Sequence, residues 1–100
     1  MIEKNSLFYM ANLYPEIGRL FSFLDSNKIE AANNAKIRSL GIVDKILSFR
    51  DIKPAGREEW NVIKNFILGY NKLDAYERII LEKYSEPFSY KFMNQYSNIL

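Results

Sequence analysis

Residues 28–49, KIEAANNAKIRSLGIVDKILSF, are the stretch that decides the fold. At about 100° per residue, most apolar side chains of this stretch fall on roughly half of a helix circumference and most polar side chains on the other half. The apolar half consists of Ile29, Ala32, Ala35, Leu40, Ile42, Val43, Ile46, Leu47 and Phe49. So broad a face is typical of a helix that contacts two neighbours, and it predicts a helical bundle rather than a two-stranded coiled coil.

The chain before this helix predicts a further helix. Apolar residues recur at three-and-four spacing from Leu7 to Leu24. Pro15 lies inside that pattern, and because proline has no backbone N–H, we expect a kink or a restart there. Residues 25–27 predict a turn, and Asn27 with Glu30 three positions later predicts a capping box at the start of the next helix.

After residue 49 the chain predicts a linker and a third helix. The linker is residues 52–56, which contain both Pro and Gly. We expect Glu58 and Glu59 in the first turn of the third helix, and residues 71–73 break it. Its predicted buried side is formed by Trp60, Ile63, Phe66, Ile67 and Tyr70.

A fourth helix is predicted to begin at Asp74, which forms a capping box with Glu77, and to stop at Pro87. Its predicted inward side carries Tyr76, Ile79, Ile80 and Tyr84. The last segment, residues 88–100, fits either a helical stripe or an alternating edge strand, and the helix is favoured.

Together these patterns predict a single domain over residues 1–100, an all-α, compact bundle of four to five helices with short loops. Hydrophobic residues make up 48% of the chain and aromatic residues 15%, which supplies enough apolar surface for a core. The net charge of +2 is small, as expected for a folded domain rather than a disordered one.

The composition removes several kinds of chemistry. The chain has no His and no Cys, so serine–histidine and cysteine–histidine catalysis and the usual zinc sites are excluded. Its four glycines are isolated, so it has no phosphate-binding loop. Same-helix acid pairs occur only at Asp74/Glu77, which form the capping box, and at Glu82/Glu86, a solvated helix end. We therefore predict no catalytic residue, metal or cofactor, although a carboxylate–metal enzyme stays open as a third alternative.

Charge and hydropathy indicate where the protein is located in the cell and whether it binds nucleic acid. No basic leader with a small-residue cleavage site and no uncharged run of about 18–20 residues is present, which predicts a cytoplasmic protein without membrane association. A modest basic patch of Arg38, Lys45, Lys53 and Arg57 supports an alternative role as a small nucleic-acid-associated regulator.

A protein partner is the favoured expectation. Phe88, Tyr90, Phe92 and Tyr96 lie in a tail that has one charged residue, so the tail must either fold back onto the bundle or be covered by a partner. The favoured function is a non-catalytic protein-interaction module (a small regulator, inhibitor or adaptor). It would act through apolar helix faces and this tail, with Arg38 and Lys45 steering the approach. The partner is another protein or a second copy of the chain.

Overall fold

A computed structural model describes residues 4–97, and the side chains up to residue 94, as four α-helices joined by short turns. The helices are α1 (Ser6–Asp25), α2 (Ile29–Leu47), α3 (Pro54–Leu68) and α4 (Ala75–Ser97), with a 3₁₀ turn, η1 (Tyr70–Lys72), between α3 and α4. No strand occurs within residues 4–97, and the predicted all-α bundle is confirmed.

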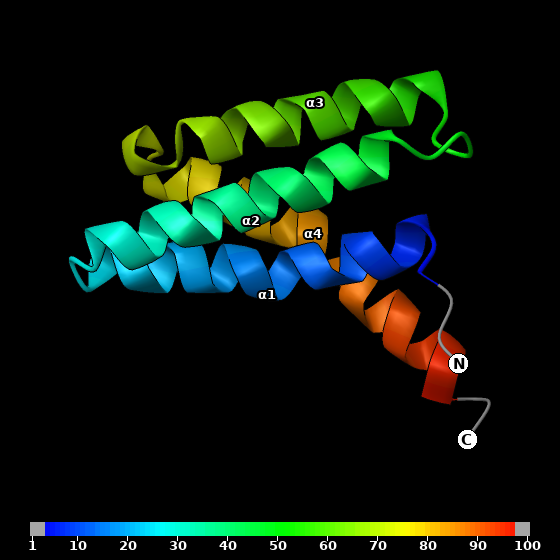
Figure 1. Cartoon of the computed structure of the whole chain (residues 1–100), viewed down its shortest axis with the longest axis horizontal. Coiled ribbons are helices and arrows are strands. Elements are labelled where there is room, and N and C mark those ends of the chain that lie inside the picture. The colour runs from blue at the N-terminus through cyan, green and yellow to red at the C-terminus, as the bar shows by residue number, and fades with distance from the viewer. Residues whose placement is uncertain (1–3, 98–100) are drawn as a thin grey trace.

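The helices pack in an order set by their short connections. α1 and α2 form an antiparallel pair, α3 covers the other side of α2, and α4 lies mainly against α1 (Figure 1). The C-terminal part of α4 emerges beside the first turns of α1, where the rings of Phe8 and Phe92 meet edge to face at 5.8 Å. The domain measures 40 × 31 × 22 Å.

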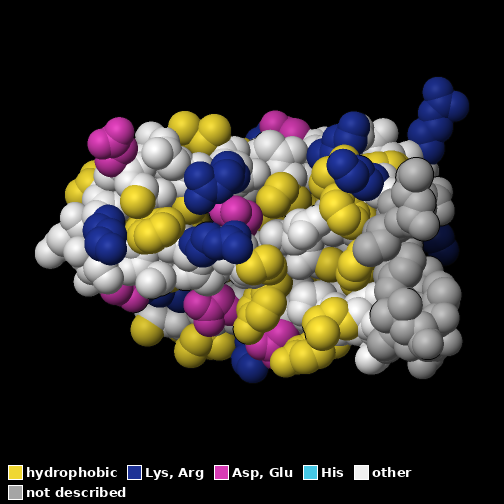
Figure 2. Space-filling view, turned by 60° about the horizontal axis from the view of Figure 1, so that its bottom comes forward, with side chains coloured by type: hydrophobic (Ala, Val, Ile, Leu, Met, Phe, Trp, Pro, Cys, Tyr) yellow, Lys and Arg dark blue, Asp and Glu magenta, His cyan; other side chains and the backbone are white. Residues whose placement is uncertain are grey.

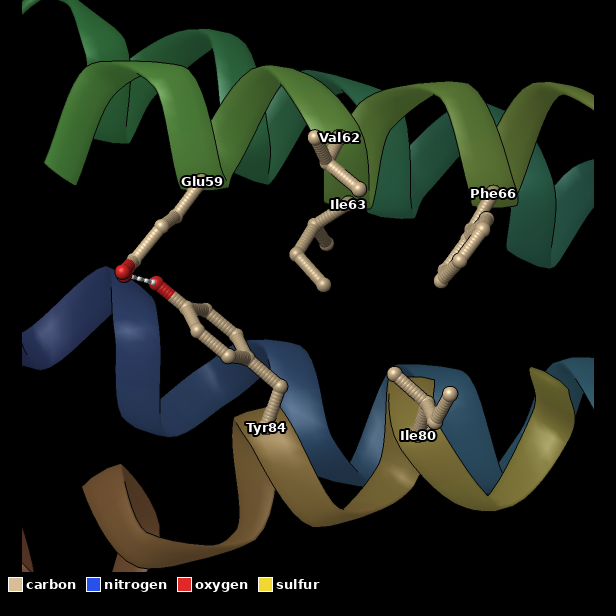
Figure 3. Close-up of a pocket in the computed structure, with 6 residues that line it drawn as sticks. All are labelled: Glu59, Val62, Ile63, Phe66, Ile80 and Tyr84. Carbon is tan, nitrogen blue, oxygen red and sulfur yellow. Dashed lines mark hydrogen bonds between the residues drawn. The ribbon is translucent and has the colours of Figure 1, made fainter. Parts of the chain in front are cut away.

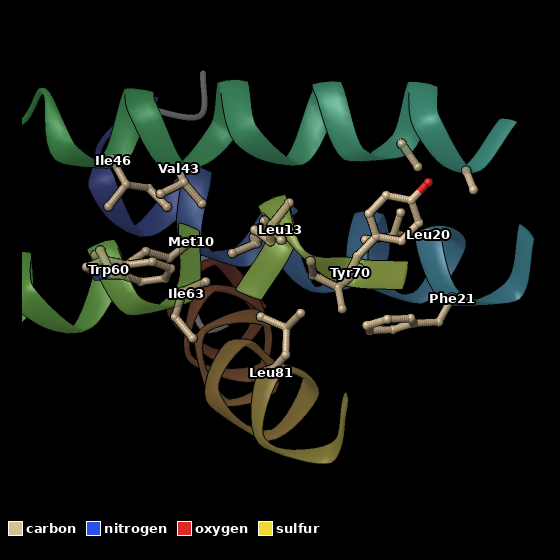
Figure 4. Packing of buried hydrophobic residues seen from close by; sticks show 14 residues of the cluster. Met10, Leu13, Leu20, Phe21, Val43, Ile46, Trp60, Ile63, Tyr70 and Leu81 are labelled. Atoms are coloured by element: carbon tan, nitrogen blue, oxygen red, sulfur yellow. The ribbon is translucent and has the colours of Figure 1, made fainter. Parts of the chain in front are cut away.

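All four helices supply the core, and α1 contributes the largest share of its buried apolar residues. Leu13, Ile17 and Leu20 are completely buried because their three-and-four spacing places them on one face of α1. Figure 4 shows Leu13 and Leu20 packed among buried side chains from the other helices. The other buried apolar residues are Met10, Phe21, Ala32, Ala35, Val43, Ile46, Trp60, Ile63, Ile67, Tyr70 and Leu81.

The first helix continues past the first of its two expected breaks and ends at the second. α1 continues through Pro15 without a restart, and Pro15 itself is exposed, so its ring faces solvent. The turn at residues 26–27 is confirmed, but Asn27 adopts a left-handed conformation (φ 57°) that ends α1. The predicted Asn27–Glu30 capping box is therefore wrong, and Lys28 precedes α2 without a side-chain cap.

The third helix begins earlier than predicted. Pro54 is its first residue, since proline's fixed φ suits the first helical position and its missing N–H is not needed there. The linker is correspondingly shorter. Glu58 and Glu59 were expected in the first turn of this helix, but they lie beyond it.

The fourth helix confirms its predicted start and corrects its end. Asp74 Oδ1 accepts a hydrogen bond from the Glu77 N–H at 2.8 Å, and Glu77 Oε1 accepts one from the Asp74 N–H at 3.1 Å. The helix does not stop at Pro87, but continues to Ser97. The favoured helical reading of the tail is thus confirmed as far as residue 97.

The buried side of α4 is also not the predicted one. Leu81 and Ser85 are completely buried, whereas Tyr76, Ile79 and Ile80 are exposed. Ser85 is accommodated because its hydroxyl donates to the backbone carbonyls of Leu81 and Glu82, each at 3.1 Å. A serine whose hydroxyl is hydrogen-bonded thus occupies a core position. Three residues of α4 that were predicted to be buried lie on the surface instead.

Candidate partner-binding slot between α3 and α4

An open apolar slot of about 270 Å³ lies between α3 and α4 (Figure 3). Its lining residues, which define the slot from here on, are Glu59, Val62, Ile63, Phe66, Ile80 and Tyr84. Residues three and four apart share one face of a helix, so α3 presents four of these side chains and α4 presents the other two.

The slot is a continuation of the core that reaches solvent. Ile63 is only 3% exposed and belongs to the buried cluster. Val62 is 51% exposed and Ile80 is 36% exposed, and their side chains project from the two facing helices (Figure 3). The protein therefore leaves apolar surface uncovered beside its core, at a place where a concave shape can receive another apolar group.

One end of the slot carries its polar groups. The Tyr84 hydroxyl donates to Glu59 Oε2 at 2.7 Å, across the space between α3 and α4 (Figure 3). Burial of Tyr84, together with this hydrogen bond and the negative charge of Glu59, raises the pKa of the tyrosine above its ordinary value. Within the described residues Glu59 has no ion pair, so its charge faces the slot without a neutralising cation.

The rings of Trp60 and Phe88 pack against Tyr84 at the polar end of the slot. The Trp60 ring meets the Tyr84 ring edge to face at 5.1 Å, and Phe88 lies 5.6 Å from Trp60 and 5.9 Å from Tyr84. These contacts fix the orientation of Tyr84 and hence the position of the carboxylate that it binds. The slot is suited to an apolar body with a hydrogen-bond donor or cation at one end.

The aromatic tail residues predicted to bind a partner have divergent environments. Phe88 packs against Trp60 and Phe92 against Phe8, so both contribute to the fold. Tyr90 is 58% exposed. The side chain of Tyr96 lies outside the residues whose side chains the structure describes.

The four predicted basic residues also have separate environments. Arg38 bonds to Glu16 at 3.0 Å, and the Lys45 ammonium lies 5.8 Å from the centre of the Tyr9 ring. Lys53 is exposed at the start of α3.

Arg57 is engaged by the backbone. Its guanidinium donates to the carbonyls of Leu47, Phe49 and Ile52 at 2.7, 2.7 and 3.1 Å. On the face shown in Figure 2, Lys and Arg side chains are interspersed with acidic, hydrophobic and other side chains. Of the four predicted residues, three therefore have contacts within the fold, and Lys53 is exposed.

Sequence reasoning missed the slot as a site, although it named several of its residues as core. Helical periodicity predicts buried positions for Phe66, Ile80 and Tyr84, and it indicates no binding role for Val62 or Glu59. The available signal was an excess of apolar residues, since Ile79, Ile80 and Leu81 cannot all face the same core.

Other site chemistries and known proteins offer no further assignment. Among the described residues no group of three or more acidic side chains could hold a metal ion, and none of the helices has the length and hydropathy that crossing a bilayer requires. Comparison with protein-family models, curated proteins and solved structures yields no match.

Proposed function

We propose that this protein is a non-catalytic interaction module, a small cytoplasmic regulator, inhibitor or adaptor that seats apolar side chains of a partner protein in the α3–α4 slot. The observation that carries the proposal is the slot itself, an apolar hollow of about 270 Å³ that opens to solvent beside the core. Concave apolar surfaces with a few fixed polar groups are the usual form of binding sites.

The surroundings of the slot support a macromolecular partner. Tyr76 is 71% exposed and lies one helical turn before Ile80, and Ile79 beside it is 52% exposed. With Val62 across the slot, these residues extend the apolar surface beyond the hollow. A partner that covers both the slot and this margin removes more apolar surface from water than a ligand confined to the slot.

The proposal moves the expected contact surface away from most of the aromatic tail. Phe88 and Phe92 are half-buried and make intramolecular ring contacts, so they are less available to a partner than the exposed residues of α4. Tyr90 and Met93 remain exposed on α4 at 58% and 62%, and they are available as an accessory contact. The slot is therefore the principal site, and the tail supports its geometry through Phe88.

The test compares capture by three forms of the tagged protein from its native cell lysate, with nuclease added. The slot variant is Val62→Glu combined with Ile80→Glu, which places charge on two exposed slot residues. The matched control is Ile37→Glu, an isoleucine of α2 that is 59% exposed and does not line the slot. Thermal melts by circular dichroism verify that all three forms are folded.

We expect the wild type and Ile37→Glu to capture the same stoichiometric protein and the slot variant to lose it. A photo-crosslinking amino acid at position 62 should attach to that protein, and the same amino acid at position 37 should not. Capture that persists in the slot variant contradicts the proposal. Recovery that depends on nucleic acid and disappears with nuclease supports the nucleic-acid alternative.

A further inference from the structure

The slot's single carboxylate indicates which kind of partner it receives. We infer that the occupant is a cationic amphipathic α-helix that places an Arg or Lys beside Glu59 and apolar side chains along the slot towards Phe66. This inference rests on the proposed function, because it assigns the chemistry of the partner for that same slot.

The charge of Glu59, unlike that of four other acids, is not balanced by a cation within the described residues. Asp25, Asp44 and Glu16 each lie within 3.0 Å of a Lys or Arg nitrogen, which neutralises them within the fold. Glu59 instead accepts a hydrogen bond from the neutral Tyr84 hydroxyl, which orients the carboxylate and leaves its charge in place. Glu58, also exposed, adds a second negative charge next to it along the chain.

An apolar surface with an oriented anion at its end favours a partner of opposite charge. Covering Glu59 with an apolar group would remove the carboxylate from water without compensation, which is costly. A guanidinium or ammonium group supplies a charge-assisted hydrogen bond in place of the lost water. Charge complementarity thus selects a cationic residue at this end and leaves the rest of the contact apolar.

The spacing of the slot residues matches the spacing of a helix. Glu59 and Phe66 are seven positions apart on α3, which corresponds to about 10.5 Å along its axis at 1.5 Å per residue. Val62 and Ile63 lie between them. A partner helix aligned with α3 therefore matches the slot with a cation at one position and apolar residues three or four and then seven positions away.

The experiment uses two synthetic 18-residue helical peptides, acetylated and amidated, on an Ala/Gln background. Each carries Leu at positions three, four and seven residues from a single variable residue, which is Arg in one peptide and Glu in the other. Both chain directions are made, because the slot does not define which way the partner runs. Trp60 is the only tryptophan and contacts Tyr84, so its fluorescence reports occupancy of the slot.

We expect the Arg peptide to bind the full-length protein about tenfold more tightly than the Glu peptide at low salt. Glu59→Gln should bring the two affinities within about twofold, and Glu59→Arg should reverse the preference. Glu58→Gln is the matched control, since it removes the adjacent carboxylate, which does not line the slot, and it should keep most of the preference.

The unfavourable outcomes separate the two proposals. Equal affinity for both peptides, with loss of binding in Val62→Glu, overturns the cationic partner and leaves the slot as a docking site. If neither peptide binds, the inference of a helical partner is wrong. The capture experiment tests the slot as a docking site independently of the peptides. If the wild type sediments as a dimer that Val62→Glu dissociates, the occupant is a second copy of the chain, and the inference is wrong.

Discussion

The guanidinium of Arg57 donates to the carbonyl oxygen of Leu47 at 2.7 Å, which joins the first turn of α3 to the last residue of α2. Two more bonds from the same group reach the Phe49 and Ile52 carbonyls. One side chain thus satisfies three backbone acceptors in the α2–α3 connection, including one of those that a helix end leaves unpaired.

Replacing Arg57 should destabilise the fold measurably. Arg57→Ala leaves three carbonyls without this donor, and hydrogen bonds from a charged group are worth about 1.5–3 kcal/mol each when their partners are buried. Because the site is only partly buried, we expect a total loss of about 2–3 kcal/mol in the free energy of unfolding. Urea denaturation monitored by Trp60 fluorescence measures it.

Lys53 provides the control for this prediction. It is exposed, belongs to the same predicted basic patch and makes none of these bonds, so Lys53→Ala should change stability by no more than about 0.5 kcal/mol. Equal effects of the two substitutions would mean that Arg57 contributes no more than an ordinary surface charge.

The buried side of α4 is tested by a pair of aliphatic residues two positions apart. Leu81 is completely buried, and Leu81→Ala should cost about 2–5 kcal/mol because it removes core contacts and leaves a cavity. Ile79 is 52% exposed, and Ile79→Ala should cost less than about 1 kcal/mol. Thermal unfolding by circular dichroism compares them, and a larger loss at Ile79 would contradict the orientation of α4.

Alkaline pH should weaken the fold through Tyr84. Its folded-state pKa is raised above the ordinary value of about 10, so between these two values the folded chain keeps a proton that the unfolded chain loses. The stabilisation is complete below about pH 9 and is lost as pH rises through and above the unfolded-state pKa. Tyr14, whose hydroxyl bonds to Glu86, acts in the same direction.

Tyr84→Phe isolates that contribution. At pH 8.5 the variant should be less stable than the wild type. The difference in the free energy of unfolding should shrink as the pH approaches 11, because only the wild type has the Tyr84 hydroxyl whose stabilising effect is lost at high pH. Lysine titration affects both proteins equally and cancels in the comparison. Urea denaturation at four pH values measures the difference, and a difference independent of pH would refute the assignment.

The aromatic tail is tested by two of its own members. Phe88→Ala removes a ring that contacts Trp60 and Tyr84 and should cost about 2 kcal/mol, less than a fully buried Phe because Phe88 is only half-buried. Tyr90→Ala should cost less than about 0.5 kcal/mol, since Tyr90 is 58% exposed. If the two variants unfold at the same temperature, Phe88 does not anchor α4 as described.

Most of the fold follows from patterns in the sequence, and the exceptions have local causes. The broad apolar face of residues 28–49 correctly predicted a helix with two neighbours, and the Asp74–Glu77 capping box located the start of α4. Neither a restart at Pro15 nor a stop at Pro87 occurs, because an exposed proline inside a helix costs one hydrogen bond, which tertiary packing of the surrounding helix outweighs.

The slot was less predictable because it depends on how two helices meet. Single-helix periodicity assigns an apolar residue to the core, yet it cannot show that α3 and α4 diverge enough to leave Val62 and Ile80 uncovered. The pairing of Glu59 with Tyr84 joins residues that are 25 positions apart and follows from that same arrangement. The fold class is thus encoded locally, whereas the site arises from tertiary packing.

The attachment of α4 to α1 has a consequence for the order in which the chain folds. α1 and α2 are joined by a three-residue turn and can pair early, whereas the Tyr14–Glu86 and Asp25–Arg78 bonds close loops of 72 and 53 residues. Loop closure of that length carries an entropic cost that contacts within the α1–α2 hairpin avoid. α4 should therefore dock last and open first, and hydrogen exchange should be faster in α4 than in α1 and α2.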